Sequence, residues 1–216
     1  MTDRLYYEDS HLAAFPAMVT ACEQEKDYWK VALDQTAFFP EGGGQAGDTG
    51  YLGDVEVFDT HGKNGEIWHY TRQPLEIGAE VKGVLDWKKR FSRMQQHSGE
   101  HIVSGLIHTR FGYDNVGFHL GEEEVTMDFN GPITKEELLE IETAANQVVF
   151  GNVPIQISYP SKEELAVLDY RSKIEIEGQV RIVTIPDIDV CACCAPHVNT
   201  TGEIGLIKLT NVQSHR

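Results

Sequence analysis

The chain has 216 residues, enough to bury a hydrophobic core in one large domain or in two small ones. Its formal net charge of −16 at pH 7 opposes unselective binding to nucleic acids, because their phosphates carry the same sign of charge. No apolar run approaches the roughly 18 to 20 residues that a membrane helix needs. No basic and apolar leader opens the sequence, so we expect a cytoplasmic protein without a membrane partner.

The first part of the chain favours short strands. Between about Phe15 and Trp87, apolar residues alternate with polar ones in several runs that are separated by turn signals such as "HGKNGE". The runs are "AMVTACEQ", "YWKVALD", "YLGDVEVFD", "EIWHYT" and "EVKGVLDW". Successive strands without an intervening helix predict a small β-barrel, which we assign to an N-terminal domain of residues 1–88.

The second part mixes helices and strands. From Phe91 to about Arg110, apolar residues and histidines recur at helical spacing, and a second helix follows the capping signal of Thr134 and Glu137. "SKEELAVL" indicates a short helix, and "VPIQISYP", "VRIVTIPDIDV" and "IGLIKLTNV" indicate strands. The predicted fold class is therefore α+β, in which residues 89–216 form a mixed domain with helices packed on an antiparallel sheet.

Two histidines stand four residues apart in the first predicted helix, in the stretch "HSGEH". Residues at this interval share one face of a helix, so His97 and His101 can offer ring nitrogens to one ion. The pair alone is equally compatible with core or surface histidines. It does not fit HExxH, in which a glutamate follows the first histidine directly, and this disfavours a zinc peptidase.

A second potential ligand pair lies near the C-terminus, in "CACCAPH". Cys193 and His197 again stand four residues apart, and a thiolate with imidazoles is a ligand set that zinc prefers. Crowded cysteines suit a metal site better than a disulfide framework. Two such pairs predict a zinc site formed by His97, His101, Cys193 and His197. Cys191 and Cys194 remain alternative thiolate ligands.

Together these motifs resemble the editing domain of alanyl-tRNA synthetase and its freestanding relatives, the AlaX trans-editing proteins. The signature of that family pairs HxxxH with a downstream CxxxH, matched here by "HSGEH" and "CCAPHVNTTGEIG". "DQTAFFPEGGGQAGDTG", "FHLGEEEVTMDF" and "IEGQVRIV" agree as well, so the resemblance covers nearly the whole chain. The N-terminal barrel and the length are similar to the medium-length class. Where the family often has Cys-Gly-Gly-Thr-His, this chain keeps the spacing with a different linker.

The resemblance implies a zinc-dependent hydrolase with one Zn²⁺ per chain. Its substrate would be tRNA(Ala) mischarged with serine, with glycine as a second candidate, and we expect the protein to be a monomer. The chemistry is compatible with the sequence, because an aminoacyl ester is already activated and needs a positioned water rather than a covalent nucleophile. The competing hypothesis is a non-catalytic module, stabilised by zinc, that binds tRNA or an amino acid.

The resemblance also places Thr36 and Gln45 in the substrate pocket, where we expect them to form hydrogen bonds with the serine hydroxyl. Alanine would leave such a buried polar group unpaired, at a cost of roughly 1 to 3 kcal/mol. The glycines between them would let backbone amides approach the ligand closely, although such a segment alone indicates only a flexible turn. These glycines are Gly42, Gly43 and Gly44.

Two further features have both a functional and a purely structural interpretation. A basic run could bind the phosphates of the tRNA acceptor stem, or form a solvated face. It comprises Lys88, Lys89, Arg90 and Arg93. Glu100, inside "HSGEH", could orient a ligating imidazole, but the sequence favours a solvated helix carboxylate.

Overall fold

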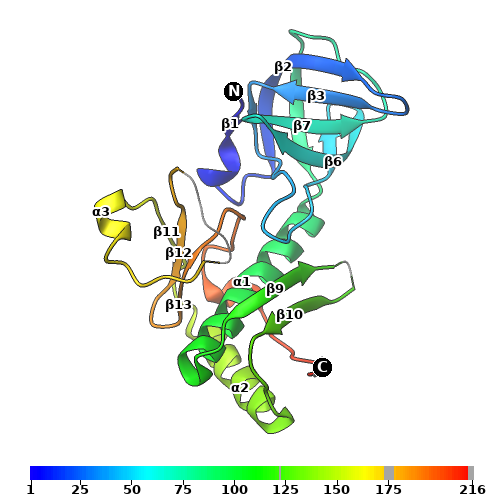
Figure 1. The fold of residues 1–216 in the computed structure, drawn as a ribbon. Coiled ribbons are helices and arrows are strands. Elements are labelled where there is room, and N and C mark those ends of the chain that lie inside the picture. Colours follow the sequence, from blue (N-terminus) through cyan, green and yellow to red (C-terminus); the bar gives the residue numbers. More distant parts are fainter. Residues whose placement is uncertain (122, 173–177, 214–216) are drawn as a thin grey trace. The chain divides into compact units, whose positions relative to one another are not determined.

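Figure 1 shows the computed structural model, which describes residues 1–121, 123–172 and 178–213. Helices combine with mostly antiparallel sheets, which confirms the α+β class predicted from the sequence. The chain divides into two compact units, Met1–Arg93 and Met94–Arg216, where the sequence placed the boundary between residues 88 and 89. Among the described residues, no helix is both long enough and apolar enough to cross a membrane.

The first unit is built around six strands that pair in a closed barrel, in the order β2-β3-β7-β6-β5-β8. Figure 1 labels β2, β3, β6 and β7 of this barrel. Every pair around this ring is antiparallel. A two-residue strand pair, β1 with β4, is parallel. The bounds are β1 Asp3–Arg4, a 3₁₀ turn Leu5–Tyr7, β2 Ala14–Gln24, β3 Trp29–Leu33, β4 Gln35–Thr36, β5 Gly50–Leu52, β6 Val55–Lys63, β7 Glu66–Thr71 and β8 Glu80–Leu85.

The alternation of side chains in these strands explains the core of the first unit. Every second residue at the start of β2 is buried, beginning with Phe15, and the same period holds along β7. Gly83 in β8 leaves room for Phe15, because a Cβ atom at Gly83 would lie 2.4 Å from the Phe15 ring. The period that predicted strands from the sequence therefore also determines which side chains fill the interior.

The second unit contains most of the helix α1 and all later elements. The strands β9 and β10 form an antiparallel pair, and β11, β12 and β13 form a three-stranded antiparallel sheet. The bounds are α1 Trp87–Phe111, β9 Asn115–Leu120, β10 Val125–Phe129, α2 Lys135–Gly151, β11 Gln156–Ser158, α3 Lys162–Leu165, β12 Ile182–Ile185, β13 Asp189–Ala192 and a 3₁₀ turn Thr201–Ile204.

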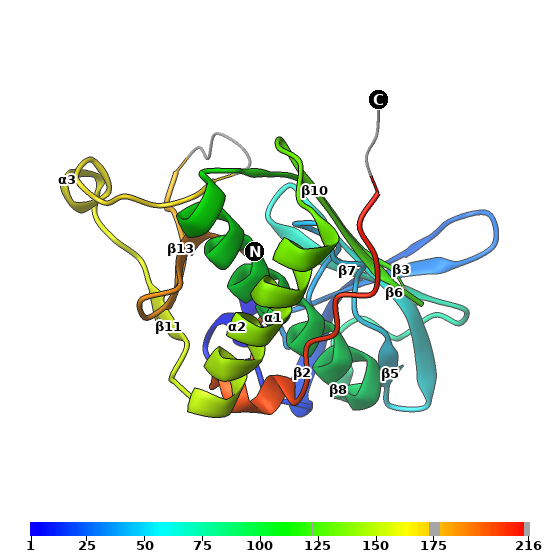
Figure 2. The ribbon, with the colours of Figure 1, turned by 90° about the horizontal axis from the view of Figure 1, so that it is seen from below.

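The helix α1 lies between α2 and the turn that joins β12 to β13. The helix α2 runs beside the C-terminal part of α1 in both views (Figures 1 and 2), and Arg110 forms an ion pair with Glu140 between them. On another side, a Cβ atom at Gly105 would lie 2.3 Å from the carbonyl oxygen of Ile188. A glycine in the middle of α1 therefore permits close contact between this helix and the turn before β13.

Local signals located the helices correctly but not all the strands. The capping box at Thr134 is formed, as the sequence predicted for α2, and a second capping box at Ser161 begins the predicted short helix α3. The single strand predicted over residues 180–190 is instead two strands, because Asp187 adopts a left-handed conformation with φ of 64°. The sequence did not predict the β9–β10 pair.

The predicted strand over residues 204–212 is wrong. Ile204 ends a 3₁₀ turn, and no strand is assigned between residues 205 and 213. Side chains of α2 satisfy peptide groups there instead. Asn146 bonds both the N–H and the carbonyl of Ile207, at 3.0 and 2.8 Å, and Glu142 accepts from the N–H of Leu209 at 2.6 Å. These bonds take the place of a strand ladder.

Candidate metal centre

The helix α1 carries the two histidines of "HSGEH" on one buried face. Asp86 caps its N-terminus, since its Oδ1 accepts a hydrogen bond from the backbone N–H of Lys89 at 3.2 Å. Gly112, with φ of 70°, ends the helix, and its N–H donates to the carbonyl of His108. Between these ends, the rings of His97 and His101 lie 5.5 Å apart, centroid to centroid, and both side chains are buried. The predicted i, i+4 geometry is therefore present.

The C-terminal pair meets these histidines in the second unit. Cys193 follows directly after β13, and its Sγ lies 3.6 Å from Nε2 of His97 and 3.5 Å from Nε2 of His197. The four potential ligand atoms of His97, His101, Cys193 and His197 all lie within 4.8 Å of one another. The structure thus brings together all four residues that the sequence proposed as metal ligands.

These distances fit a tetrahedral metal ion. With bonds of about 2.3 Å to sulfur and about 2.0 to 2.1 Å to nitrogen, two ligand atoms of a zinc tetrahedron lie about 3.6 Å apart. The separations of 3.5 and 3.6 Å between sulfur and nitrogen match that value. One thiolate and three imidazoles also form a donor set that suits zinc. Both the geometry and the chemistry of the residues therefore fit such an ion.

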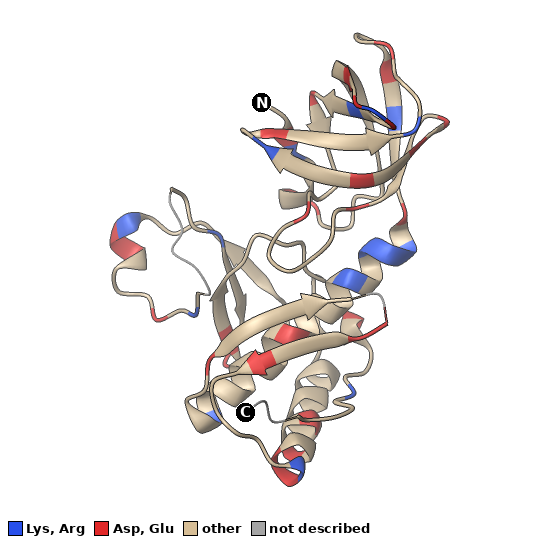
Figure 3. Ribbon diagram, turned by 45° about the vertical axis from the view of Figure 1, so that its right-hand side comes forward, with Lys and Arg blue, Asp and Glu red and all other residues tan. Residues whose placement is uncertain are grey.

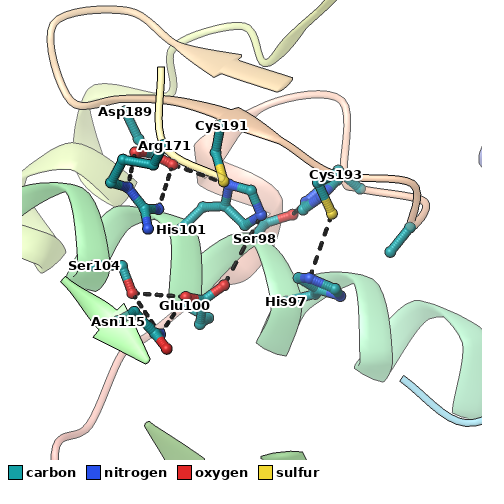
Figure 4. Close-up of polar contacts among 12 residues, drawn as sticks. His97, Ser98, Glu100, His101, Ser104, Asn115, Arg171, Asp189, Cys191 and Cys193 are labelled. Atoms are coloured by element: carbon teal, nitrogen blue, oxygen red, sulfur yellow. Dashed lines mark hydrogen bonds and ion pairs between the residues drawn. The ribbon is translucent and has the colours of Figure 1, made fainter. Parts of the chain in front are cut away.

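Other residues hold the ligand rings from outside, as Figure 4 shows for His101. Nδ1 of His101 lies 3.0 Å from Oδ2 of Asp189, and Nδ1 of His197 lies 2.9 Å from Oγ of Ser98. Arg171 fixes Asp189 in turn through two contacts, Nε to Oδ1 at 2.7 Å and Nη2 to Oδ2 at 2.9 Å. Such outer contacts leave Nε2 of each ring directed toward the cluster.

The electrostatics of the cluster favour a thiolate at Cys193. Burial alone would raise the pKa of this thiol, but the neighbouring imidazoles outweigh burial and hold the pKa well below its usual value. Burial lowers the pKa of His197 to about 3, so this ring is neutral, as a metal ligand must be. Cys191 differs from Cys193, because burial raises the pKa of its thiol.

The three cysteines of the C-terminal motif lie in different surroundings. Cys193 faces all three histidines, whereas Cys191 groups with His101 and Asp189 only, and Cys194 is exposed. Asp189, Cys191 and Cys193 alternate along β13 and its continuation, so they share one face. This arrangement favours Cys193 as the thiolate ligand and makes Asp189 part of the same site.

Glu100 is not the solvated carboxylate that the sequence favoured. Its side chain belongs to a residue that is only 3% exposed, and Oε1 accepts from Oγ of Ser104 at 2.6 Å and from Nδ2 of Asn115 at 2.8 Å (Figure 4). Oε2 lies 3.9 Å from Nε2 of His101. The helical period explains the burial, since Glu100 and Ser104 occupy one face of α1, which β9 contacts through Asn115.

The glycine-rich segment belongs to the first unit and forms a tight turn. Gly42 and Gln45 exchange backbone hydrogen bonds of 3.0 and 3.1 Å, and the two central glycines have positive φ, 60° at Gly43 and 81° at Gly44. Positive φ at both central positions is typical of a type I′ turn, which explains the need for glycine there. The side chain of Gln45 is buried.

Thr36 is also buried, in the interior of the first unit. Its Oγ1 lies 2.8 Å from Nε2 of His69 and accepts a hydrogen bond from the N–H of Phe38 at 3.1 Å. Nδ1 of His69 lies 2.9 Å from the carbonyl oxygen of Val31. The sequence singled out Thr36 but not His69, although the alternation in "EIWHYT" places His69 on the inward face with Ile67.

The basic run at the beginning of α1 is visible in Figure 3, but its members have different surroundings. Lys88 and Lys89 are exposed. Arg90 is only 1% exposed, forms an ion pair with the buried Asp48 and donates to the carbonyl of Ala37 at 3.1 Å. The prediction that Arg90 binds phosphates is therefore wrong, because its guanidinium is buried in the first unit and is already bound by protein groups. Arg93 is partly buried and donates to the carbonyl of Gly47 at 2.8 Å.

The chain is similar to parts of aminoacyl-tRNA synthetases and to alanyl-tRNA editing proteins. Residues 180–216 match the family model described as the second additional domain of threonyl and alanyl tRNA synthetases, and residues 2–89 match the model of class II (A) tRNA synthetases. The alanyl-tRNA editing protein AlaX-M of Saccharolobus solfataricus is 35% identical over 99% of this chain and 94% of its own length.

Two longer relatives show the same likeness. The alanyl-tRNA editing protein AlaX-L of Pyrococcus horikoshii is 36% identical over 97% of this chain and 54% of its own length. The alanyl-tRNA editing protein Aarsd1 of Rattus norvegicus is 31% identical over 86% of this chain and 46% of its own length. The chain therefore spans about half the length of these two relatives and nearly all of AlaX-M.

Proposed function

The chain belongs to the AlaX family of alanyl-tRNA editing proteins, and on this basis we propose that it is a trans-editing hydrolase that deacylates mischarged tRNA(Ala). Serine is the proposed amino acid to be removed, and glycine is a second candidate. The observation that carries the proposal is the cluster of His97, His101, Cys193 and His197, whose ligand atoms lie within 4.8 Å of one another.

The four residues of this cluster are proposed to hold one Zn²⁺ ion. When bound, zinc would supply a positive charge that stabilises the oxyanion developing on the ester carbonyl. The residues of the chain prepare the site: Oδ2 of Asp189 contacts Nδ1 of His101 and Oγ of Ser98 contacts Nδ1 of His197, so that Nε2 of each ring is the atom available to the ion. Glu100, fixed by Ser104 and Asn115, adds a buried carboxylate beside His101.

Selection for serine is proposed to depend on Thr36, with Gln45 and the glycines 42–44 forming the rest of the pocket. Alanine is smaller than serine, so a pocket cannot exclude alanine by size. A buried hydroxyl partner can discriminate, because it stays unpaired when alanine binds. The exposed Lys88 and Lys89, together with Arg93, remain proposed contacts for the acceptor-stem phosphates.

One observation favours a second candidate function. Four protein ligands complete a tetrahedral shell, whereas a catalytic zinc normally keeps one position for water or substrate. A module with a purely structural zinc, which only binds tRNA ends or an amino acid, would need no such position. Loss of one ligand on substrate binding, or a fifth ligand, would reconcile the closed shell with catalysis.

Release of serine from Ser-tRNA(Ala) separates the two functions. Purified protein of measured zinc content should shorten the half-life of this ester and spare Ala-tRNA(Ala). An unchanged half-life, together with retained tRNA binding, would reject the hydrolase and favour the binding module.

The pocket residues have a matched pair of variants. Thr36→Val keeps the shape and should lower the serine-to-alanine rate ratio by at least about fivefold. Thr71→Val removes another buried hydroxyl, on β7, which donates to the carbonyl of Gln73 at 2.8 Å. This control should leave the ratio unchanged. Equal ratios in both variants would show that Thr36 does not contact the amino acid.

A further inference from the structure

His69, which is buried inside the first unit, has both ring nitrogens bound by protein atoms. Nδ1 of His69 lies 2.9 Å from the carbonyl oxygen of Val31, and Nε2 lies 2.8 Å from Oγ1 of Thr36. A carbonyl oxygen can only accept, so Nδ1 must carry a hydrogen. Burial lowers the pKa of His69 to about 4, so the ring is neutral at pH 7 and carries only that one hydrogen.

This tautomer determines which hydrogen bonds the hydroxyl of Thr36 donates and which it accepts. Since Nε2 of His69 has no hydrogen, it must accept, and Thr36 must donate its single hydrogen to it. Oγ1 also accepts from the N–H of Phe38 at 3.1 Å, so one of its two lone pairs is occupied. Thr36 can therefore offer a ligand one lone pair and no hydrogen.

We propose that His69 is a specificity-determining positioning residue, which makes Thr36 an acceptor-only partner for the amino acid on the tRNA. The inference rests on the proposed function, because it concerns the same pocket. A serine side chain brings a hydroxyl hydrogen that can fill the remaining lone pair. Alanine and glycine have no hydroxyl hydrogen, so this arrangement favours the binding of serine over both.

The surroundings of the pair keep this direction constant. Both residues are fully buried, and the ring of Phe38 packs edge-on against His69 with centroids 5.1 Å apart. In such a site, water does not compete for either nitrogen, and the ring cannot turn without breaking the bond to Val31. The chain Val31–His69–Thr36 is thus a fixed series of hydrogen bonds that ends at the threonine oxygen.

The test compares deacylation of Ser-tRNA(Ala) and Gly-tRNA(Ala) by variants of the full chain. His69→Phe keeps an aromatic ring but removes the acceptor, which frees the hydrogen of Thr36. We expect the serine rate to fall about tenfold while the glycine rate stays within about twofold. His69→Gln can present an amide oxygen in place of Nε2 and should restore most of the serine rate. Thr71→Val, on the same strand, is the control and should keep the wild-type ratio.

A second measurement does not depend on any variant folding. Nitrogen-15 shifts of the imidazole in the wild-type protein should show hydrogen on Nδ1 and none on Nε2 at pH 7. Hydrogen on Nε2 would overturn the inference. So would equal losses of the serine and glycine rates in His69→Phe, which would make His69 a residue of the barrel core alone.

The outcomes also separate the two proposals. A wild-type protein that leaves Ser-tRNA(Ala) intact would reject the hydrolase and, with it, this role of His69. A wild-type protein that deacylates Ser-tRNA(Ala), with an unchanged serine-to-glycine ratio in His69→Phe, would reject the role of His69 and leave the proposed function standing.

Discussion

Buried histidines in the two units differ in one respect that separates their roles. His69 in the first unit has both nitrogens bound by protein atoms, Val31 O and Thr36 Oγ1. His101 and His197 in the second unit have Nδ1 bound by Asp189 and Ser98, while the other nitrogen faces the sulfur of Cys193. An imidazole that is held at Nδ1 and directs Nε2 toward a shared point suits a metal ligand, whereas an imidazole with both nitrogens bound by protein atoms suits the positioning of a neighbouring side chain.

Buried arginine–aspartate pairs provide a second comparison between the units. Arg90 and Asp48 hold the backbone of the glycine-rich segment, where Asp48 accepts from the N–H of Phe39 at 2.8 Å. Arg171 and Asp189 hold the ring of His101. The same pair of residue types thus stabilises a loop in one unit and orients His101, a proposed metal ligand, in the other.

The largest effect is expected from removing the metal ligands. Cys193→Ala combined with His197→Ala should abolish both metal retention and deacylation, because half of the ligand set is lost. Metal analysis after dialysis measures retention. The exposed Cys194→Ala is the control, and it should keep full metal content. Full metal in the double variant would show that other residues bind the ion.

The next effect concerns the pair in the first unit. Arg90→Met should lower the free energy of unfolding by roughly 3 to 5 kcal/mol, since it leaves the carboxylate of Asp48 buried without its partner. Lys89→Met, at an exposed neighbouring position, should change it by less than about 0.5 kcal/mol. Urea unfolding compares the two, and similar values would contradict the burial of the ion pair.

The pH dependence of stability should reveal the contribution of the buried His69. Burial lowers the pKa of His69 to about 4 in the folded protein. As the pH falls, the unfolded chain therefore binds a proton at this histidine near pH 6.5, whereas the folded protein binds it only near pH 4. The contribution is complete above pH 6.5 and is lost as the pH falls through 4, for a total of about 3 kcal/mol. Unfolding free energies of wild type and His69→Gln, measured from pH 7.5 to 4, should converge by about this amount; parallel curves would count against it.

The smallest effect is expected from a residue that only orients a ligand. Asp189→Asn keeps the shape but weakens the bond to His101, so metal affinity should fall about 10- to 100-fold without loss of the site. Asp187→Asn is the matched control, because Asp187 is exposed in the turn before β13. Competition with a chelator measures both. An unchanged affinity in Asp189→Asn would mean that the ring of His101 is held by its packing alone.

Local sequence signals predicted the elements whose formation depends on neighbouring residues. The capping boxes at Thr134 and Ser161 and the barrel strands follow from spacing within a few residues. The strand predicted over residues 204–212 failed because its peptide groups bond Asn146 and Glu142, which are distant in the chain. A pattern of apolar residues cannot indicate such partners.

By itself, the sequence determined the types and the spacing of the proposed ligands. They form two pairs, one in the first predicted helix and one near the C-terminus, and the members of each pair stand four residues apart. Only the tertiary structure decided that Cys193 is the thiolate nearest the three imidazoles, that Arg90 and Glu100 are buried, and that His69 binds Thr36. The physical reason is that helix and strand periods express contacts between close neighbours. Burial and hydrogen-bond partners across the chain depend on how the elements pack.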